Sequence, residues 1–507
     1  MLMNRSHLSS LAAAPLATAA QRLHGQLVDL RSQIHAEAQT TFARWRSEIG
    51  RRAFLPSAWN LAQYLAFRHR DLRSLQPELT SLGLSSLGRC ESRVLPTIDA
   101  VLTALGVMAD PQARASPVVD MRRFFLGERL LARETRRLFG PPPAQRHVRI
   151  MVTLPAEAAS DPAVVRDLLR RGMDCARINC AHGDPAEWGA TVRNLRAAEH
   201  ETGRSCRVLM DLSGPRARLA ATLSAIPDSR VRSGDRILLM SGSPRPSDEF
   251  PLQAQCAPPG ALACIRDGAR VMIDEGKIVT VAERRVADGW VVRVQRTQPK
   301  GGRFVAEKGL NFPDSTLELP PLGQKDLADL DAVVELADIV GYSFVQEVVD
   351  VDRLFGELAR RGPRAATLPV SIKVETARAV RNLPELIVRA GGRRSVAVMI
   401  ARGDLAVELG YERLAEMQEE LLWVAEAAHV PVIWATQVLE RLVKKGTPSR
   451  AEITDAAMAV RAECVMLNKG PCILKAVEVL DDVLRRMQEH QSKKTPQLRA
   501  LRSWVPA

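Results

Sequence analysis

The feature that most constrains the fold of this chain is a regular alternation of strands and amphipathic helices that begins at Val148. Each strand is a short apolar run, as in parallel sheets that are covered on both faces, and a helical segment follows it. The predicted strands are 148–154, 175–179, 208–212, 339–344, 368–374, 396–400, 430–434 and 464–467. Eight parallel strand-helix units predict an α/β fold, a closed (β/α)8 TIM barrel whose reacting groups lie at the carboxyl ends of the strands.

The alternation is interrupted between residues 222 and 310. This stretch consists of short β-like runs, such as Arg236-Ile-Leu-Leu-Met240 and Trp290-Val-Val-Arg-Val294, with Asp-Gly turns nearby. The pattern predicts a small all-β domain, an inserted β-barrel, within the larger barrel. The predicted TIM barrel therefore comprises residues 147–221 and 311–490, and a tail follows at 491–507.

Residues 1–140 show apolar positions three and four apart, which predicts an all-helical N-terminal domain with helices near 17–47, 57–80 and 89–107. Gly140-Pro-Pro-Pro143 is then a stiff, extended linker. Residues 1–146 contain 20 Arg, no Lys and 11 acidic residues, so a nucleic-acid surface is one alternative. The interleaved acids and the helical spacing favour a solvated helix face instead.

Composition excludes several classes of protein. The 507 residues, 46% of them hydrophobic and 25% charged, are enough for two or three domains with full cores. No apolar run reaches the ~20 residues that a membrane helix needs. The eight cysteines show no metal-ligand spacing, so neither zinc nor a disulfide framework is expected. We therefore expect a cytoplasmic protein without a membrane or nucleic-acid partner.

Two strand ends predict a metal site. Side chains alternate along a strand, so Lys373 and Glu375 share one face, and Asp404 follows the next strand ~4.8 Å away. Two carboxylates this close repel each other unless a cation lies between them, and Mg²⁺ suits two carboxylates and a phosphate. A purely structural pair of Lys373 and Glu375 is the alternative, but the two strands together favour the metal.

Other strand ends carry charged or polar residues as well. They are Arg177, Asn179, Asp211, Arg218, Arg402, Gly403, Thr436 and Gln437. Each residue alone could form an ion pair at the barrel rim. Together, cations, carboxylates and a hydroxyl at one end of a barrel suit phosphoryl transfer, in which the protein positions oxygens and neutralises their charge.

At these residues the sequence resembles the pyruvate kinase family, over residues 147 to about 490. The motifs that carry the resemblance are Met173-Asp-Cys-Ala-Arg-Ile-Asn-Cys-Ala-His-Gly183, Asp211-Leu-Ser-Gly-Pro-Arg-Ala-Arg218, Lys308-Gly-Leu-Asn311, Ile372-Lys-Val-Glu375, Ile400-Ala-Arg-Gly-Asp-Leu405, Ala435-Thr-Gln437 and Pro448-Ser-Arg-Ala-Glu452. The resemblance implies an inserted domain that closes as a lid, and the glycolytic reaction of phosphoenolpyruvate and ADP, with Mg²⁺ or Mn²⁺, to pyruvate and ATP. It also implies a homo-oligomer.

The resemblance further implies roles for individual residues. Lys373 would stabilise the phosphoryl group in transfer, Arg177 would serve both phosphate and nucleotide, and Thr436 would be linked to protonation of the enolate through a water or relay. Glu375 and Asp404 match the metal ligands. The implied substrate contacts are Arg177, Ala401, Arg402, Gly403, Asp404 and Thr436, and the implied nucleotide contacts are Arg177, Asn179, His182, Arg218 and Lys308.

The resemblance also bears on K⁺, which many members bind through oxygens at the positions of Asn179, Ala181, Asp211 and Leu212. Two of these positions are aliphatic here. Arg216 matches the basic residue of cation-independent members, and its guanidinium could permanently supply the charge that K⁺ lends. We therefore expect that K⁺ is not required, with a rim salt bridge as the alternative role of Arg216.

The sequence departs from the family at several points. Asn468-Lys469-Gly470 replaces a Ser-Gly-Glu run, and Gln346 replaces a basic residue. The family's C-terminal effector domain does not follow the barrel, so no activation by fructose bisphosphate is expected. These departures leave two alternatives: a low-turnover or inactive regulatory homologue that retains the phosphoenolpyruvate pocket, and another metal-dependent enolate enzyme. Retention of Lys373, Glu375 and Asp404 favours the phosphotransferase.

Overall fold

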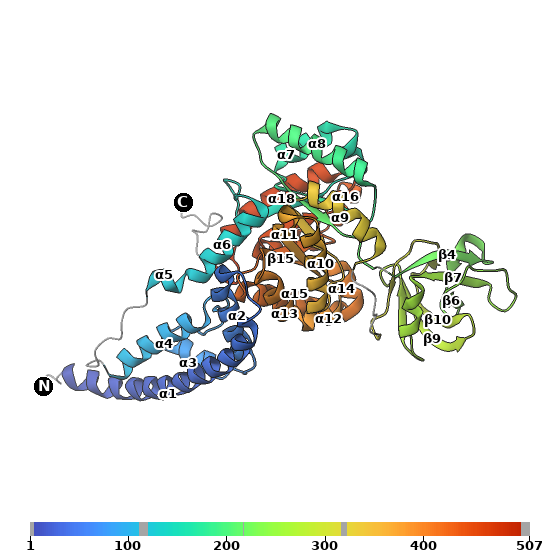
Figure 1. Cartoon of the computed structure of the whole chain (residues 1–507). Helices are drawn as coiled ribbons and strands as arrows, with labels where there is room; N and C mark the ends of the chain where they lie inside the picture. The colour runs from blue at the N-terminus through green and yellow to red at the C-terminus, as the bar shows by residue number, and fades with distance from the viewer. Residues whose placement is uncertain (1–4, 111–119, 216, 316–321, 498–507) are drawn as a thin grey trace, which may run out of the picture.

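The computed structural model describes residues 5–110, 120–215, 217–315 and 322–497. Figure 1 shows three parts: a helical domain at the N-terminal end (blue), a central barrel, and a small β domain (green) that projects from the barrel. Within the described residues, none of the helices combines the length and the apolar character needed to cross a membrane.

The central part is a closed parallel barrel with the strand order β1-β17-β16-β15-β14-β13-β3-β2. Its strands are β1 Arg149–Thr153, β2 Cys175–Asn179, β3 Arg207–Asp211, β13 Ile339–Tyr342, β14 Val370–Val374, β15 Val396–Ala401, β16 Val432–Ala435 and β17 Cys464–Leu467. The predicted (β/α)8 barrel is therefore confirmed. Nearly every strand residue is buried, because helices cover the outer face and side chains fill the interior.

Helices follow the barrel strands, and several of them begin at a side chain that caps the first turn. The main ones are α7 Pro162–Arg171, α8 Pro185–Thr202, α9 Gln324–Leu336, α10 Val348–Arg360, α11 Pro363–Thr367, α12 Ala377–Arg381, α13 Leu383–Gly391, α14 Arg402–Leu409, α15 Tyr411–Ala427, α16 Glu440–Lys445, α17 Arg450–Met458 and α18 Ile473–Gln488. Asp161 and Asp184 cap α7 and α8 by accepting backbone N–H groups, and Ser449 forms a capping box with Glu452 at α17.

The end of helix α6, Leu126–Phe139, closes the amino end of the barrel. Leu138 and Phe139 are buried in the same cluster as the inward-facing strand residues Met151, Met399 and Ile433. The N-terminal domain thus supplies part of the barrel core, and the two parts share one hydrophobic interior.

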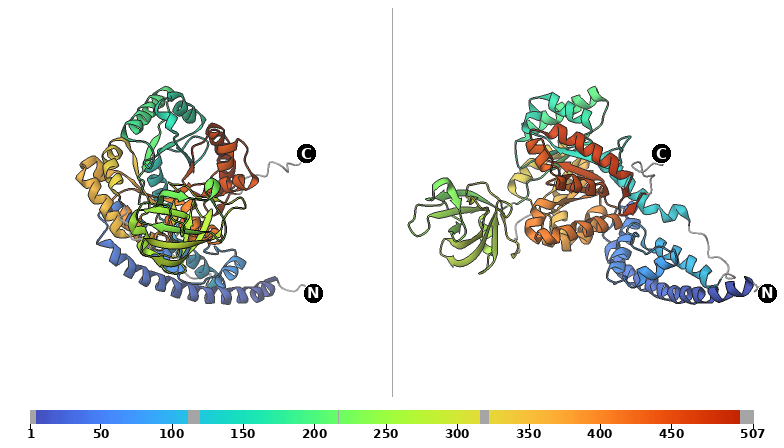
Figure 2. Two further views of the ribbon diagram at one scale, coloured as in Figure 1. Left: turned by 90° about the vertical axis from the view of Figure 1, so that its right-hand side faces the viewer. Right: turned by 180° about the vertical axis from the view of Figure 1, so that it is seen from behind.

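The rest of the helical domain consists of α1 Arg5–Arg46, α2 Leu55–Arg68, α3 Leu75–Ser81, α4 Val94–Ala109 and the short α5 Met121–Phe124. Helix α1 is long and curved and runs along the outer side of the domain (Figure 2). The prediction of one helix over 57–80 was wrong, because the chain turns between α2 and α3. There the Asp71 carboxylate accepts the backbone N–H of Arg73 at 3.0 Å, a local bond that competes with the helix.

Two buried polar side chains attach the helical domain to the barrel. Asn60 donates to the carbonyl of Ala427 at 2.8 Å. The ring of His429 lies 3.0 Å from both Ser57 Oγ and the carbonyl oxygen of Ser92. Burial lowers the pKa of His429 to about 4, so the ring is neutral and donates to Ser92 while it accepts from Ser57.

The β domain contains a seven-stranded sheet with the order β12-β8-β9-β10-β6-β7-β4. Its strands are β4 Arg218–Ser224, β6 Arg236–Met240, β7 Leu252–Ala257, β8 Arg270–Ile273, β9 Ile278–Val286, β10 Gly289–Arg296 and β12 Leu310–Asn311. The small pair β5 Arg230–Val231 and β11 Gly302–Arg303 lies beside the sheet. Strand β4 begins at Arg218, earlier than the boundary at 222 drawn from the sequence. The segment after α18 forms a hairpin, β18 Gln491–Ser492 and β19 Thr495–Pro496.

Glu426, near the end of α15, is a carboxyl group whose charge opposes folding. Burial, together with the carboxylates of Glu91 and Glu463, raises its pKa to about 7, although Lys493 and Lys494 act in the opposite direction. The folded protein therefore holds this proton more tightly than the unfolded chain does. For that reason stability falls as the pH rises from the usual pKa of 4.5 to about 7.

Replacing Glu426 with Gln should raise the free energy of unfolding by about 3 kcal/mol at pH 8 and by less than about 1 kcal/mol at pH 5, because only the charged form is costly. Urea denaturation at the two pH values measures the difference. An equal gain at both pH values would contradict the assignment of the buried charge to this residue.

Candidate active site

Lys373 lies at the centre of a buried cluster at the carboxyl ends of the barrel strands. Its Nζ donates to Ser343 Oγ at 2.6 Å, and it lies 3.2 Å from Glu375 Oε1 and 3.6 Å from Asp211 Oδ2. Burial lowers the pKa of Lys373, but the two carboxylates outweigh burial and raise it overall. The ammonium group is therefore a fixed positive charge in a protected site.

Asp211, the last residue of β3, lies between two cations. Arg177 Nε donates to Asp211 Oδ2 at 2.6 Å, and the same guanidinium donates to Thr153 Oγ1 at 3.0 Å. Burial acts to raise the pKa of Asp211, but Lys373 and Arg177 lower it below its usual value. The carboxylate is therefore ionised, and it holds both cations in position.

Glu375 and Asp404 are the carboxylates expected to bind a divalent metal. Glu375 Oε2 accepts the backbone N–H of Phe344 at 2.6 Å. Burial raises the pKa of Glu375, and the nearby Asp404 carboxylate raises it further against the opposing effect of Lys373. These two carboxylates thus repel each other in a buried site, and a divalent cation would relieve that repulsion.

The pair fits a metal that shares its ligands with substrate and water. Among the residues that the structure describes, no group of three or more His, Cys, Asp or Glu side chains could hold a metal ion. Mg²⁺ commonly binds one or two carboxylates and takes its remaining oxygens from waters and substrate phosphates. Glu375 and Asp404 fit that mode of binding. Two carboxylates are too few ligands for a closed zinc site, which takes four side chains.

Thr436 follows β16 in a strained turn. Its φ is +62°, and that of Gln437 is +58°, a region that non-glycine residues rarely adopt and that is frequent at functional sites. Thr436 Oγ1 accepts the backbone N–H of Gly403 at 2.8 Å. The hydroxyl is therefore fixed as an acceptor toward α14, and its own proton remains available for another group.

Arg402 points away from the Lys373 cluster. Its guanidinium lies 4.6 Å from the ring centre of Trp434, donates to the carbonyl of Ala435 at 3.0 Å and contacts Asp455 Oδ2 at 2.9 Å. Ala401, which ends β15, is buried beside Ala435 in the neighbouring strand. Arg402 thus supports the turn that carries Thr436, and its contact with substrate stays a prediction.

Asn179 ends β2, the strand that carries Arg177, and His182 follows it in the next loop. Asn179 Oδ1 accepts the backbone N–H of Ala181 at 3.2 Å. Burial and then the charges of Lys469, Arg177 and Lys325 lower the pKa of His182. Lys469, a departure from the family pattern, therefore adds positive charge close to this histidine.

Among the described residues, the predicted nucleotide residues of the β domain form their side-chain ion pairs within that domain. Arg218 pairs with Glu307 at 3.4 Å, and Lys308 Nζ donates to Asp274 Oδ1 at 3.0 Å. The structure therefore does not bring Arg218 or Lys308 to the Lys373 cluster. A lid that moves toward the barrel would be needed to do so. Arg216, the proposed replacement for K⁺, lies outside the described residues.

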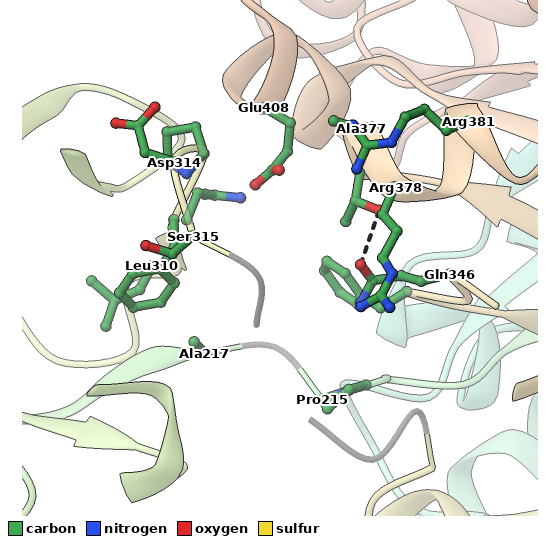
Figure 3. Close-up of a pocket in the computed structure, with 15 residues that line it drawn as sticks. Pro215, Ala217, Leu310, Asp314, Ser315, Gln346, Ala377, Arg378, Arg381 and Glu408 are labelled. Carbon is green, nitrogen blue, oxygen red and sulfur yellow. Dashed lines mark hydrogen bonds between the residues drawn. The ribbon is translucent and has the colours of Figure 1, made fainter. Parts of the chain in front are cut away.

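A cavity of about 240 Å³ lies between the β domain and the barrel (Figure 3). Leu310, Asp314 and Ser315 line it on the side of the β domain, and Gln346 and Arg378 line it on the side of the barrel. Gln346 accepts a hydrogen bond from Thr376, drawn as a dashed line, at 3.4 Å. The cavity is therefore a cleft between the two domains.

Three residues of the site were missed by the sequence analysis. Ser343 binds Lys373, Thr153 binds Arg177, and Lys325 Nζ donates to the carbonyl of Cys180 at 2.8 Å. Thr153 ends β1 and Ser343 directly follows β13, so the rule that polar residues end catalytic strands would have found both. Lys325 lies on α9, where no such signal exists.

Comparisons with known proteins agree with this architecture, an α/β barrel with a buried cluster of paired charges at the carboxyl ends of its strands and an inserted β domain. The family model "Pyruvate kinase, barrel domain" matches residues 145–471. The chain is 32% identical to the pyruvate kinase of Mycobacterium tuberculosis (strain H37Rv), over 69% of this chain and 72% of that protein. It is 31% identical to a pyruvate kinase of Agrobacterium vitis over 69% and 71%, and 30% identical to pyruvate kinase 2 of Synechocystis over 72% and 60%. The chain belongs to the pyruvate kinase family.

Proposed function

We propose that this protein transfers the phosphoryl group of phosphoenolpyruvate to ADP, forming pyruvate and ATP with Mg²⁺ or Mn²⁺. The observation that carries the proposal is the position of Lys373, whose Nζ lies within 3.6 Å of both Asp211 and Glu375. Family membership and relatives named pyruvate kinase support the same reaction. An ammonium group at the mouth of the barrel suits a phosphoryl group whose oxygens carry the developing charge.

The cluster would hold the phosphoryl oxygens by electrostatics. Arg177 is buried and anchored by Asp211 and Thr153, so its unused N–H groups are directed without further loss of side-chain entropy. Lys373 is held in the same way by Ser343. Two anchored cations thus form a preorganised site for an anion.

The proposed Mg²⁺ would be held by Glu375 and Asp404, and it would neutralise charge on the phosphate and the enolate oxygen. Glu375 is also fixed by the backbone N–H of Phe344. The carboxylate therefore keeps its orientation whether or not a cation is present.

Thr436 is proposed to take part in protonation of the enolate. Because its oxygen accepts the N–H of Gly403, the hydroxyl proton can be donated toward the substrate. An ordinary hydroxyl is a weak acid, so a water or a relay must supply the proton that finally reaches carbon. The proposal includes no requirement for K⁺.

The direct test is release of pyruvate from phosphoenolpyruvate by the full-length protein. Pyruvate should form only when both ADP and Mg²⁺ are present, in potassium-free buffer. Binding of phosphoenolpyruvate without release of pyruvate would refute the phosphotransferase and identify a binding homologue.

Changing Glu375 to Gln or Asp404 to Asn should raise the Mg²⁺ concentration needed for half-maximal activity by about tenfold or more, because each change removes a charged ligand oxygen. A Mg²⁺ titration of initial rates measures this. Glu416→Gln, an exposed change on α15, is the matched control and should leave the titration unchanged. Wild-type Mg²⁺ dependence in both variants would place the metal elsewhere.

A further inference from the structure

A second and larger cavity lies at the amino end of the barrel, opposite the Lys373 cluster. Its volume is about 770 Å³. Three parts of the chain line it: the helical domain around Arg93 and α6, the barrel around Arg149 and Glu463, and the C-terminal hairpin. Arg149 is the first residue of β1, whereas the residues of the proposed active site follow the opposite ends of the strands. The two sites are therefore separate.

The lining of this cavity is strongly basic. Its basic residues are Arg89, Arg93, Arg133, Arg136, Arg149, Arg461, Lys493 and Lys494. Its acidic residues are Glu91, Glu128, Glu426 and Glu463. Because the basic residues are twice as numerous, the cavity attracts anions.

Ion pairs use only some of these cations. Arg93 pairs with Glu128, Lys493 pairs with Glu463, and Lys494 pairs with Glu91 at 2.5 Å. Arg461 reaches outside the cavity to Glu419 at 2.5 Å. These pairs leave part of the positive charge uncompensated.

Arg89 and Arg136 carry that remaining charge. Both are exposed, and neither forms a salt bridge or a side-chain hydrogen bond with any residue that the structure describes. They come from different segments, one before α4 and the other on α6, and both line the same cavity. Two unpaired guanidinium groups can hold a tetrahedral anion bidentately.

Arg149 adds a buried cation to the same wall. It is 5% exposed and donates only to carbonyl oxygens, those of His147 and Gly140, each at 2.7 Å. Its Nε has no acceptor among the described residues. Burial lowers the pKa of Arg149, although Cys464 and Cys175, and then Asp174 and Glu463, act in the opposite direction. A buried guanidinium that no carboxylate directly contacts is costly, and an anion in the cavity would offset that cost.

The cavity also has apolar walls, which a bare inorganic anion would not use. Phe125, Leu131 and Val460 contribute to the lining, and the volume lies within the usual range for sites that bind organic molecules. We propose that this cavity is a binding site for a phosphorylated organic molecule, whose phosphate is held by Arg89, Arg136 and Arg149.

Occupancy would join the helical domain, the barrel and the C-terminal hairpin through one molecule. A ligand that binds only the folded assembly raises its melting temperature, and the rise grows with the logarithm of the ligand concentration once that concentration exceeds the Kd. Binding at the amino end of the barrel would not compete with a substrate at the opposite end. The proposal is therefore independent of the proposed reaction.

The test is calorimetric titration of the full-length protein with phenyl phosphate and, separately, with inorganic phosphate. Phenyl phosphate should bind more tightly, because it also contacts the apolar wall. Arg89→Ala and Arg136→Ala should each weaken its binding about tenfold. Arg137→Ala is the matched control, since Arg137 is exposed on the same helix but does not line the cavity, and it should change binding less than about twofold.

Several results would overturn the proposal. They are an absence of binding to the wild type, unchanged binding in both cavity variants, and equal weakening in Arg137→Ala. Unchanged binding in the cavity variants would assign the phosphate to another site, such as the proposed active site. Equal affinity for phenyl phosphate and inorganic phosphate would show that the apolar wall does not contribute to binding, and the ligand would not be an organic phosphate. Melting curves without ligand, which should match the wild type, confirm that the variants are folded.

Discussion

Replacing Lys373 with methionine should reduce the turnover number by roughly 100-fold or more, because loss of one preorganised charged donor costs about 2.7 kcal/mol or more in the transition state. The ammonium group lies between Asp211 and Glu375, where its charge can act on a phosphoryl group in transfer. The turnover number should therefore fall more than the Michaelis constant rises. Steady-state rates of pyruvate release measure both constants.

The same substitution also removes a buried positive charge between two carboxylates. Asp211 retains Arg177 as a partner, and Glu375 retains the N–H of Phe344, so we expect the variant to fold with reduced stability. Circular dichroism spectra and melting curves separate this loss from the loss of turnover. Lys445→Met, an exposed change on α16, is the control and should leave both unaltered. Near-normal turnover of Lys373→Met would refute the proposed role.

The barrel could be predicted from the sequence because its signal is repeated. Each strand is buried on both faces, so each appears as a short apolar run with polar residues at its end. Lys373 and Glu375 were expected on one face of a strand. In the structure Lys373 lies beside Glu375 and also beside Asp211. Alternation along one strand was enough for that inference.

The individual partners of side chains that follow strands or helices could not be predicted in this way. Arg402 follows a strand like the other site residues, yet it reaches Asp455 on a distant helix and stacks on Trp434. The break between α2 and α3 depends on one side-chain bond from Asp71, which the apolar spacing of the segment does not reveal. Sequence periodicity reports which face is buried, and it carries no information on such individual partners.

A single methyl group at Gly341, introduced by Gly341→Ala, should lower turnover by about 100-fold although it replaces no charged residue. Gly341 lies on β13 directly beside Asp211 on β3. A Cβ atom there would overlap Oδ1 of Asp211 and lie 2.9 Å from its Cγ. The backbone of β3 is also too close, since the added Cβ atom would lie 3.1 Å from Asp211 Cα.

Asp211 must therefore shift, and with it the two cations that it holds. Arg177 and Lys373 would both lose their fixed positions, because each contacts the same Oδ2 atom. A displacement of about 1 Å in such a site costs roughly 100-fold in rate, and overpacking a buried position costs about 1–3 kcal/mol of stability. Pyruvate release and urea denaturation measure the two effects.

Gly356→Ala is the matched control, because Gly356 is exposed on α10 and a Cβ atom there meets nothing within 4 Å. It should leave activity unchanged and raise stability by about 0.5–1 kcal/mol, the usual gain from removing a helix glycine. Asp211→Asn tests the same contact differently, since it keeps the shape but weakens the hold on both cations. If Gly341→Ala kept full activity while Asp211→Asn lost it, the charge of Asp211 would matter and its exact position would not. Full activity in both variants would mean that the cluster around Asp211 has no part in the reaction.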